Sequence, residues 1–119
     1  AKYIEVTDTD YSIGTSMAVL SAFNLVTAYP ESGKLLCVFE GVIAAGTQPV
    51  FMRCGTGVAF RVAEANTTVH VHIERIRTGT PGEALTVAWE ANAAAGGSPA
   101  VKTGGAYGTA TAKTIPLLS

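Results

Sequence analysis

The chain has 119 residues, a hydrophobic fraction of 48% and a net charge of −1, which fits one domain with a core of ordinary size. Its charged fraction is only 14%, against about 25% in a typical soluble domain, so we expect other subunits or a larger structure to cover part of its surface. We expect no nucleic-acid partner, because there is no basic stripe, and no membrane partner, because polar residues break the longest uncharged run at 11–30.

The N-terminal part of the chain predicts one clear strand and one ambiguous segment. Residues 2–7 alternate in polarity, with Ile4 and Val6 on one face, and residues 7–10 then predict a turn. Residues 16–28 carry apolar side chains at helical spacing but have no charged outer face. We interpret 16–28 as strand, with a short helix as the alternative.

Short apolar runs separated by Gly, Pro, Asn and Asp follow along the middle of the chain. The run at 35–43 has Glu40 as its only charged residue and predicts a central strand covered on both faces. The remaining runs lie at 50–54, 58–63, 68–77 and 85–90. Strands at this spacing predict an all-β fold, an antiparallel β-sandwich of jelly-roll-like build, as a domain over residues 1–90.

The composition changes in residues 91–119, which are rich in Ala, Gly and Thr. Lys102 and Lys113 are the only charged residues there, and few large apolar side chains are available to offset the entropy of ordering. An apolar cluster, Ile115-Pro116-Leu117-Leu118, stands near the end. We predict an extended C-terminal arm whose tip docks on a neighbour, with a last strand of the same domain as the alternative.

Two cysteines, Cys37 and Cys54, lie inside apolar runs and have no further cysteine at metal-binding spacing. We interpret them as buried free thiols. A disulfide becomes geometrically possible if their strands are adjacent.

The stretch TTVHVHIE, residues 67–74, holds both histidines of the chain. In a strand, His70, His72 and Glu74 share one face, which makes them candidate metal ligands. They are spaced along the strand at nearly 7 Å intervals, so one ion could bridge the histidines but would reach Glu74 only with a bend. We therefore expect cross-strand hydrogen bonds at these residues, no metal and no cofactor.

No other pattern predicts an enzyme. Serines lie outside any nucleophile elbow, and the carboxylates are scattered over different strands. Trp89 alternates in phase with Leu85 and Val87, which predicts a core residue rather than a sugar-binding platform. A cupin-like metal enzyme is a distant alternative that metal held by His70 and His72 would favour.

These features describe a small, weakly charged all-β domain with an Ala/Gly/Thr-rich arm and an apolar tip. In this overall build the chain resembles the decoration or cement proteins of tailed-bacteriophage capsids. The resemblance implies a structural virion protein on the capsid surface, assembled in the bacterial cytoplasm. It also implies a homotrimer that clamps neighbouring subunits of the major capsid protein.

The residues expected to form the attachment come from both ends of the chain. They are a docking tip of Ile115, Leu117 and Leu118, a second attachment at Tyr3 and Ile4, and Tyr107 as an intermolecular contact. The alternative function is a carbohydrate-binding or host-adhesion β-sandwich module, which would need an exposed aromatic platform.

Overall fold

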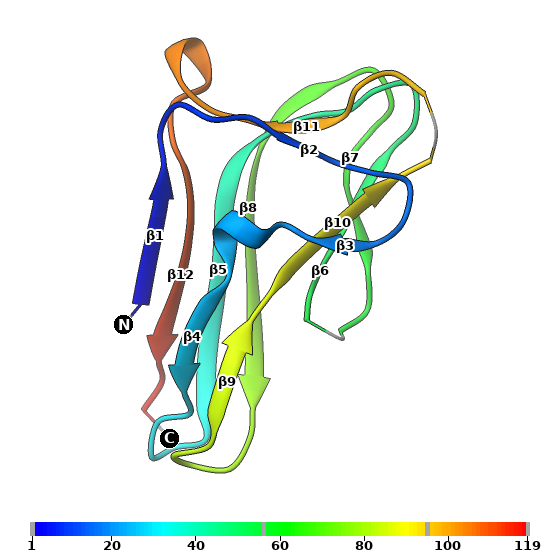
Figure 1. Cartoon of the computed structure of the whole chain (residues 1–119). Coiled ribbons are helices and arrows are strands. Elements are labelled where there is room, and N and C mark those ends of the chain that lie inside the picture. The colour runs from blue at the N-terminus through cyan, green and yellow to red at the C-terminus, as the bar shows by residue number, and fades with distance from the viewer. Residues whose placement is uncertain (1, 56, 95, 119) are drawn as a thin grey trace.

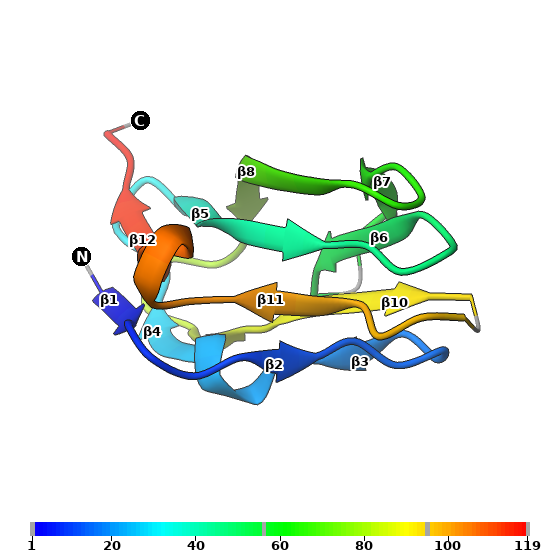
Figure 2. The same ribbon diagram turned by 90° about the horizontal axis from the view of Figure 1, so that it is seen from above.

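Two layers of antiparallel sheet face each other in this protein (Figures 1 and 2). The computed structural model describes residues 2–55, 57–94 and 96–118. The first layer is a six-stranded sheet in which β8 pairs with one edge of β5 and the remaining strands lie on the other side of β5. Its strands are β1 (Lys2–Val6), β12 (Ala110–Pro116), β5 (Lys34–Ala44), β11 (Ala100–Lys102), β2 (Tyr11–Ser12) and β8 (Thr68–Thr78).

The second layer consists of a four-stranded and a two-stranded sheet. The four-stranded sheet has the order β3 (Ala18–Val19), β10 (Trp89–Ala93), β6 (Val50–Cys54) and β7 (Phe60–Ala63); the other pairs β4 (Leu25–Ala28) with β9 (Ala84–Val87). Every strand pair is antiparallel. The prediction of an all-β antiparallel sandwich is therefore confirmed.

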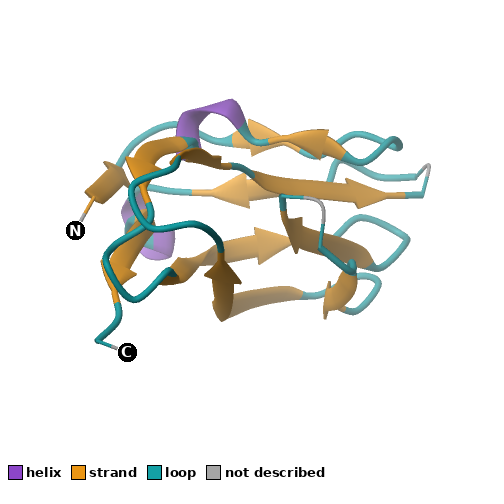
Figure 3. Cartoon of the chain, turned by 90° about the horizontal axis from the view of Figure 1, so that it is seen from below, coloured by secondary structure: helices purple, strands orange, loops and turns teal. Residues whose placement is uncertain are grey.

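The ambiguous segment 16–28 contains both kinds of structure that the sequence left open, two short strands and one turn of helix. It contains β3 and β4, joined through a single turn of 3-10 helix, η1 (Ser21–Phe23), and a second such turn is η2 (Gly105–Tyr107) (Figure 3). η1 places Phe23 in the core, which accounts for part of the helical spacing of apolar residues in this segment. Within the described ranges, no helix has the length and apolarity needed to cross a membrane.

Aromatic rings from both layers form the centre of the core. The ring centroids of Phe23 and Phe39 lie 5.2 Å apart in an edge-to-face arrangement, and those of Phe39 and Trp89 lie 5.8 Å apart. Phe39 belongs to β5 in the first layer, and Trp89 to β10 in the second. Trp89 is 0% exposed, so the prediction that it is a core residue is confirmed.

Residues 110–116 form a strand inside the first sheet, so the prediction of an extended arm was wrong and the alternative, a last strand, is what the structure has. β12 pairs with β1 on one side and with β5 on the other. The Ala and Gly content reflects close packing: a Cβ added at Gly41 of β5 would lie 3.0 Å from the Cβ of Ala110. Ala110 and Ala112 are fully buried, and at Ala110 the close approach of Gly41 leaves room only for a small side chain.

The position of β12 makes the C-terminal segment necessary for folding. A chain that ends at Ala94 loses β11 and β12, which leaves one edge of β5 unpaired and detaches β1 from the sheet. We expect this chain to lose cooperative urea unfolding and to aggregate. A chain that ends at Pro116 keeps every strand pair and should unfold as the full chain does. Circular dichroism during urea titration measures both, and cooperative unfolding of the shorter chain would contradict the essential role of β12.

Candidate functional site

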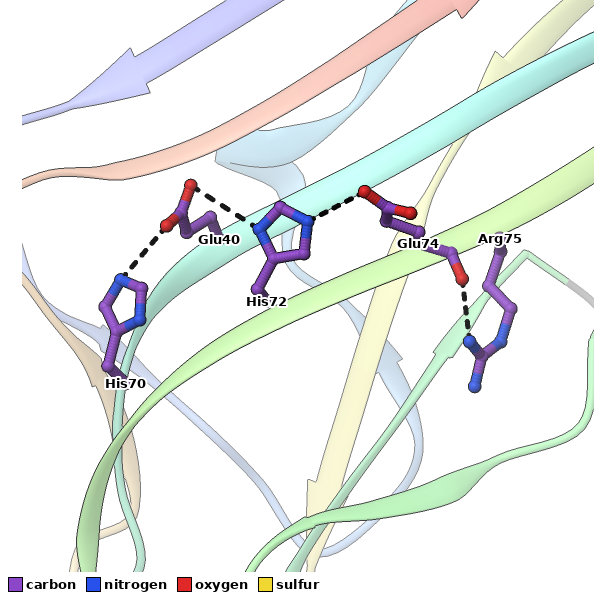
Figure 4. A network of polar contacts seen from close by, with 5 residues as sticks. All are labelled: Glu40, His70, His72, Glu74 and Arg75. Carbon is purple, nitrogen blue, oxygen red and sulfur yellow. Dashed lines mark hydrogen bonds and ion pairs between the residues drawn. The ribbon is translucent and has the colours of Figure 1, made fainter.

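A network of polar side chains lies on the outer face of the first sheet, turned away from the core (Figure 4). On β8, His70, His72 and Glu74 are exposed, whereas Val71 and Ile73 between them are buried. This is the alternation expected of a strand with one face on a core and one in solvent. The three candidate residues thus share one face, as the sequence predicted.

Glu40 of β5 connects the two histidines. It lies directly opposite His72 in the pairing of β5 with β8. One carboxylate oxygen, Oε2, is 3.3 Å from His70 Nε2, and the other, Oε1, is 3.7 Å from His72 Nδ1. On its other side, the His72 ring contacts Glu74, with 2.9 Å between Nε2 and Oε2. The expected cross-strand partner of the histidines is therefore Glu40.

This arrangement stabilises the charged form of His72. The hydrogen bond to Glu74, assisted by the negative charge of Glu40, raises the pKa of His72 above its usual value. Because the pKa of His72 is higher in the folded than in the unfolded protein, its protonation stabilises the fold at any pH below the unfolded-state pKa. This stabilisation is lost as the pH rises through the folded-state pKa. His72 and Glu74 are 47% and 55% exposed, so solvent screening keeps this contribution within the ~0.2–1 kcal/mol of surface ion pairs.

The four side chains run in a line along the strands, in the order His70, Glu40, His72, Glu74 (Figure 4). Each contact joins one ring nitrogen to one carboxylate, and the ligand candidates do not converge on a common point. Among the residues that the structure describes, no three His, Cys, Asp or Glu side chains are grouped so as to hold a metal ion. These four side chains can exchange protons with solvent, and they present alternating imidazole and carboxylate groups to a partner.

An apolar row crosses the same outer face near one end of the sheet. Leu36 of β5 pairs with Ile115 of β12 on one side and with Ile76 of β8 on the other. Ile76 is 60% exposed, and Leu36 and Ile115 are partly exposed. We call these three residues the apolar row. The predicted tip residue Ile115 therefore belongs to a flat surface of the sheet and not to a separate arm.

The remaining tip residues contact the chain's own turn at 30–34. Leu117 donates its backbone N–H to Lys34 O at 3.1 Å, and its carbonyl oxygen accepts a hydrogen bond from Ser32 Oγ at 2.5 Å. Leu118 projects beyond these bonds and is 95% exposed. The tip and the turn line an open groove of about 530 Å³, formed by residues 30–32 and 116–118.

The other predicted interface residues occupy different settings. Tyr3 lies on the outer face, 57% exposed, and its hydroxyl donates to Glu5 Oε2 at 3.0 Å. Ile4 points the opposite way and packs against the core, because successive side chains of β1 alternate. It is therefore no exposed attachment point. Tyr107 is 41% exposed, in η2, with the Lys102 ammonium 5.7 Å from its ring centroid.

Sequence reasoning missed Glu40, Leu36 and Ile76 as members of this face. The presence of Glu40 as the one charge in an apolar run was a signal for a polar role, but its partners depend on the register between β5 and β8. Comparison of the sequence with protein-family models and with curated proteins found no match.

The Glu74 contact predicts the pH response of His72. In a Glu74→Gln variant the carboxylate charge is gone, so the pKa of His72 should fall relative to the unaltered protein. Two-dimensional NMR of the imidazole resonances during a pH titration measures this pKa. Glu83→Gln, in the turn before β9, is the control and should leave the His72 titration unchanged. An unchanged His72 pKa in Glu74→Gln would contradict the assigned contact.

Proposed function

We propose that this chain is a structural virion protein that decorates or cements a bacteriophage capsid by binding across neighbouring capsid subunits. The observation that carries the proposal is the apolar row, Leu36, Ile76 and Ile115, with the exposed Leu118 near the same end of the sheet. Ile76 is exposed and Leu36 and Ile115 partly so, and apolar side chains gathered on one accessible face are typical of protein contact surfaces. The surrounding outer face supplies the polar rim such surfaces carry, through Glu74 and Lys113.

The edge strand β1 supports the proposal as a second attachment. Among the described residues, β1 pairs only with β12, so the backbone groups along its other edge have no strand partner. An extended segment of a capsid subunit could add to this edge by main-chain hydrogen bonds. η2 and both described ends of the chain lie on the side of the molecule where β1 is found (Figure 1). The elements β1 and η2, which carry the exposed Tyr3 and Tyr107, are thus on one side of the molecule.

The low charge of the chain fits an assembly role. Only 14% of the residues are charged, so contact with a partner requires the desolvation of few charged groups. Each contact of a 119-residue chain is weak by itself, but a homotrimer on a lattice engages several capsid subunits at once. The proposed function is mechanical. Many weak contacts between this protein and the capsid subunits together help the shell to resist the pressure inside it.

The proposal predicts how charge on the outer face affects assembly. In Ile76→Asp, an interface built on the apolar row would bury a carboxylate, which should weaken binding at least about tenfold. Val26→Asp is the matched control, since Val26 is 69% exposed on β4 of the second layer. Light scattering after size exclusion gives the solution mass, and co-sedimentation with tailed-phage capsids stripped of their own decoration protein gives shell binding. We expect a trimer that binds shells, weakened by Ile76→Asp alone.

Two results would overturn the proposal: equal shell binding by both variants, or a monomer that binds no shell. The second would favour the carbohydrate-binding or host-adhesion module. Tyr3 and Tyr107 are the exposed aromatic residues that such a module could use, because Trp89 is buried. Loss of glycan-array binding in Tyr3→Ala and Tyr107→Ala would then identify the platform.

A further inference from the structure

The two cysteines face each other across the sandwich. Cys37 lies on the inner face of β5 in the first layer, and Cys54 is the last residue of β6 in the second. Cys37 is 0% exposed and Cys54 4%. Both are free thiols in the same buried cluster, and they are near enough for each to affect the pKa of the other. This pair of thiols, on different sheets, is the first component of a candidate redox site.

The guanidinium of the partly buried Arg77, with its Nη1 atom shielded from solvent, is the second component. Arg77 of β8 lies opposite Leu35 of β5 and reaches across to the end of β6, where a Cβ added at Gly55 would be 2.5 Å from Arg77 Nη1. Gly55 has φ +61°, so glycine suits both the backbone and the lack of space. Among the described residues, Arg77 Nη1 is shielded from solvent and has no hydrogen-bond partner. A buried donor without an acceptor is costly, and a thiolate on the adjacent Cys54 would relieve that cost.

The ionisation of the two thiols is asymmetric. The hydrogen bond from Cys37 lowers the pKa of the Cys54 thiol to about 7, with Arg77 and Arg75 acting in the same direction and burial opposing them. The hydrogen bond to Cys54, together with burial, raises the pKa of Cys37. Cys54 is also the thiol that lines a pocket together with Arg75 and Arg77, so the positive charges favour the thiolate at Cys54.

A small pocket connects Cys54 to the surface. It has a volume of about 100 Å³ and is lined by Cys54, Gly57, Val58, Arg75, Ile76 and Arg77. This volume corresponds to roughly three water molecules at about 30 Å³ each, enough for a molecule as small as hydrogen peroxide. Cys37 is not among the lining residues, so a small oxidant meets Cys54 first.

We propose that Cys54 is a peroxide-reactive nucleophile, positioned beside the Arg77 guanidinium, and that Cys37 resolves its oxidised form into a disulfide linking β5 to β6. The Cys54 thiolate attacks one oxygen of hydrogen peroxide; an S–O bond forms, the O–O bond breaks, and the departing hydroxide takes a proton to become water. The Cys37 thiol then attacks the sulfenic sulfur of Cys54; an S–S bond forms, the S–O bond breaks, and the hydroxyl leaves as water with the Cys37 proton. The cysteines lose two electrons and the peroxide gains them. This inference does not rest on the proposed virion role.

The test treats the reduced, full-length protein with hydrogen peroxide at pH 7 and follows it by intact-mass spectrometry and peptide mapping. We expect a Cys37–Cys54 disulfide in the unaltered protein. In Cys37→Ser the resolving thiol is absent, so dimedone should trap a sulfenic acid on Cys54. In Arg77→Gln one of the charges that lower the pKa of Cys54 is absent, so the thiolate fraction and the oxidation rate should fall severalfold.

Two further variants separate reactivity from folding. Arg77→Lys keeps a positive charge and should keep most of the rate, whereas Arg61→Gln, outside the pocket, should keep all of it. Circular dichroism confirms that each variant is folded before the comparison. The proposal is overturned if Cys54 in the folded protein reacts no faster than in the urea-unfolded chain, if dimedone labels Cys37 instead, or if folded Arg77→Gln oxidises at the unaltered rate.

Discussion

The strand β5 must be paired along both edges and packed against the core on its inner face, and the first sheet depends on that requirement. β8 pairs with all of Lys34–Ala44 on one edge, while β12 and β11 divide the other edge between them. On the inner face Phe39 joins the aromatic core, whereas on the outer face Leu36 and Glu40 are partly exposed, so the prediction that this strand is covered on both faces was wrong. An apolar strand with unpaired backbone groups would be costly in water and prone to aggregation, so the pairing of β5 with β8, β12 and β11 organises the first sheet.

The sequence predicted those parts of the fold in which large apolar side chains indicate burial. The run at 35–43 corresponds to β5 at 34–44, and the run at 68–77 to β8 at 68–78. The strand at 110–116 was not preferred because its buried residues are alanine and threonine, which contribute little hydrophobic free energy by themselves. Their burial depends on Gly41 and on the backbone pairing of β1 and β5, which a single strand's composition does not reveal.

The candidate sites were predictable to the same limited extent. Alternation alone placed His70, His72 and Glu74 on one face of β8. Their contact with Glu40, like the alignment of the apolar row, depends on the register between strands that are far apart in the sequence, which local sequence patterns do not determine. The grouping of Cys37, Cys54 and Arg77 is even less predictable from local sequence, because these residues come from three strands in two layers.

The place of β12 between β1 and β5 also determines when the first sheet can be completed during synthesis. β1 is made first but pairs with β12, whose residues 110–116 are made more than 100 residues later. Until those residues leave the ribosome, β1 has no strand to join, and one edge of β5 is open to other chains. Non-local pairing of this kind is slow and exposes unpaired strands in the meantime. The chain is therefore most prone to aggregation during synthesis, before residue 116 leaves the ribosome. A chaperone that shields the edge of β5 would act in that period.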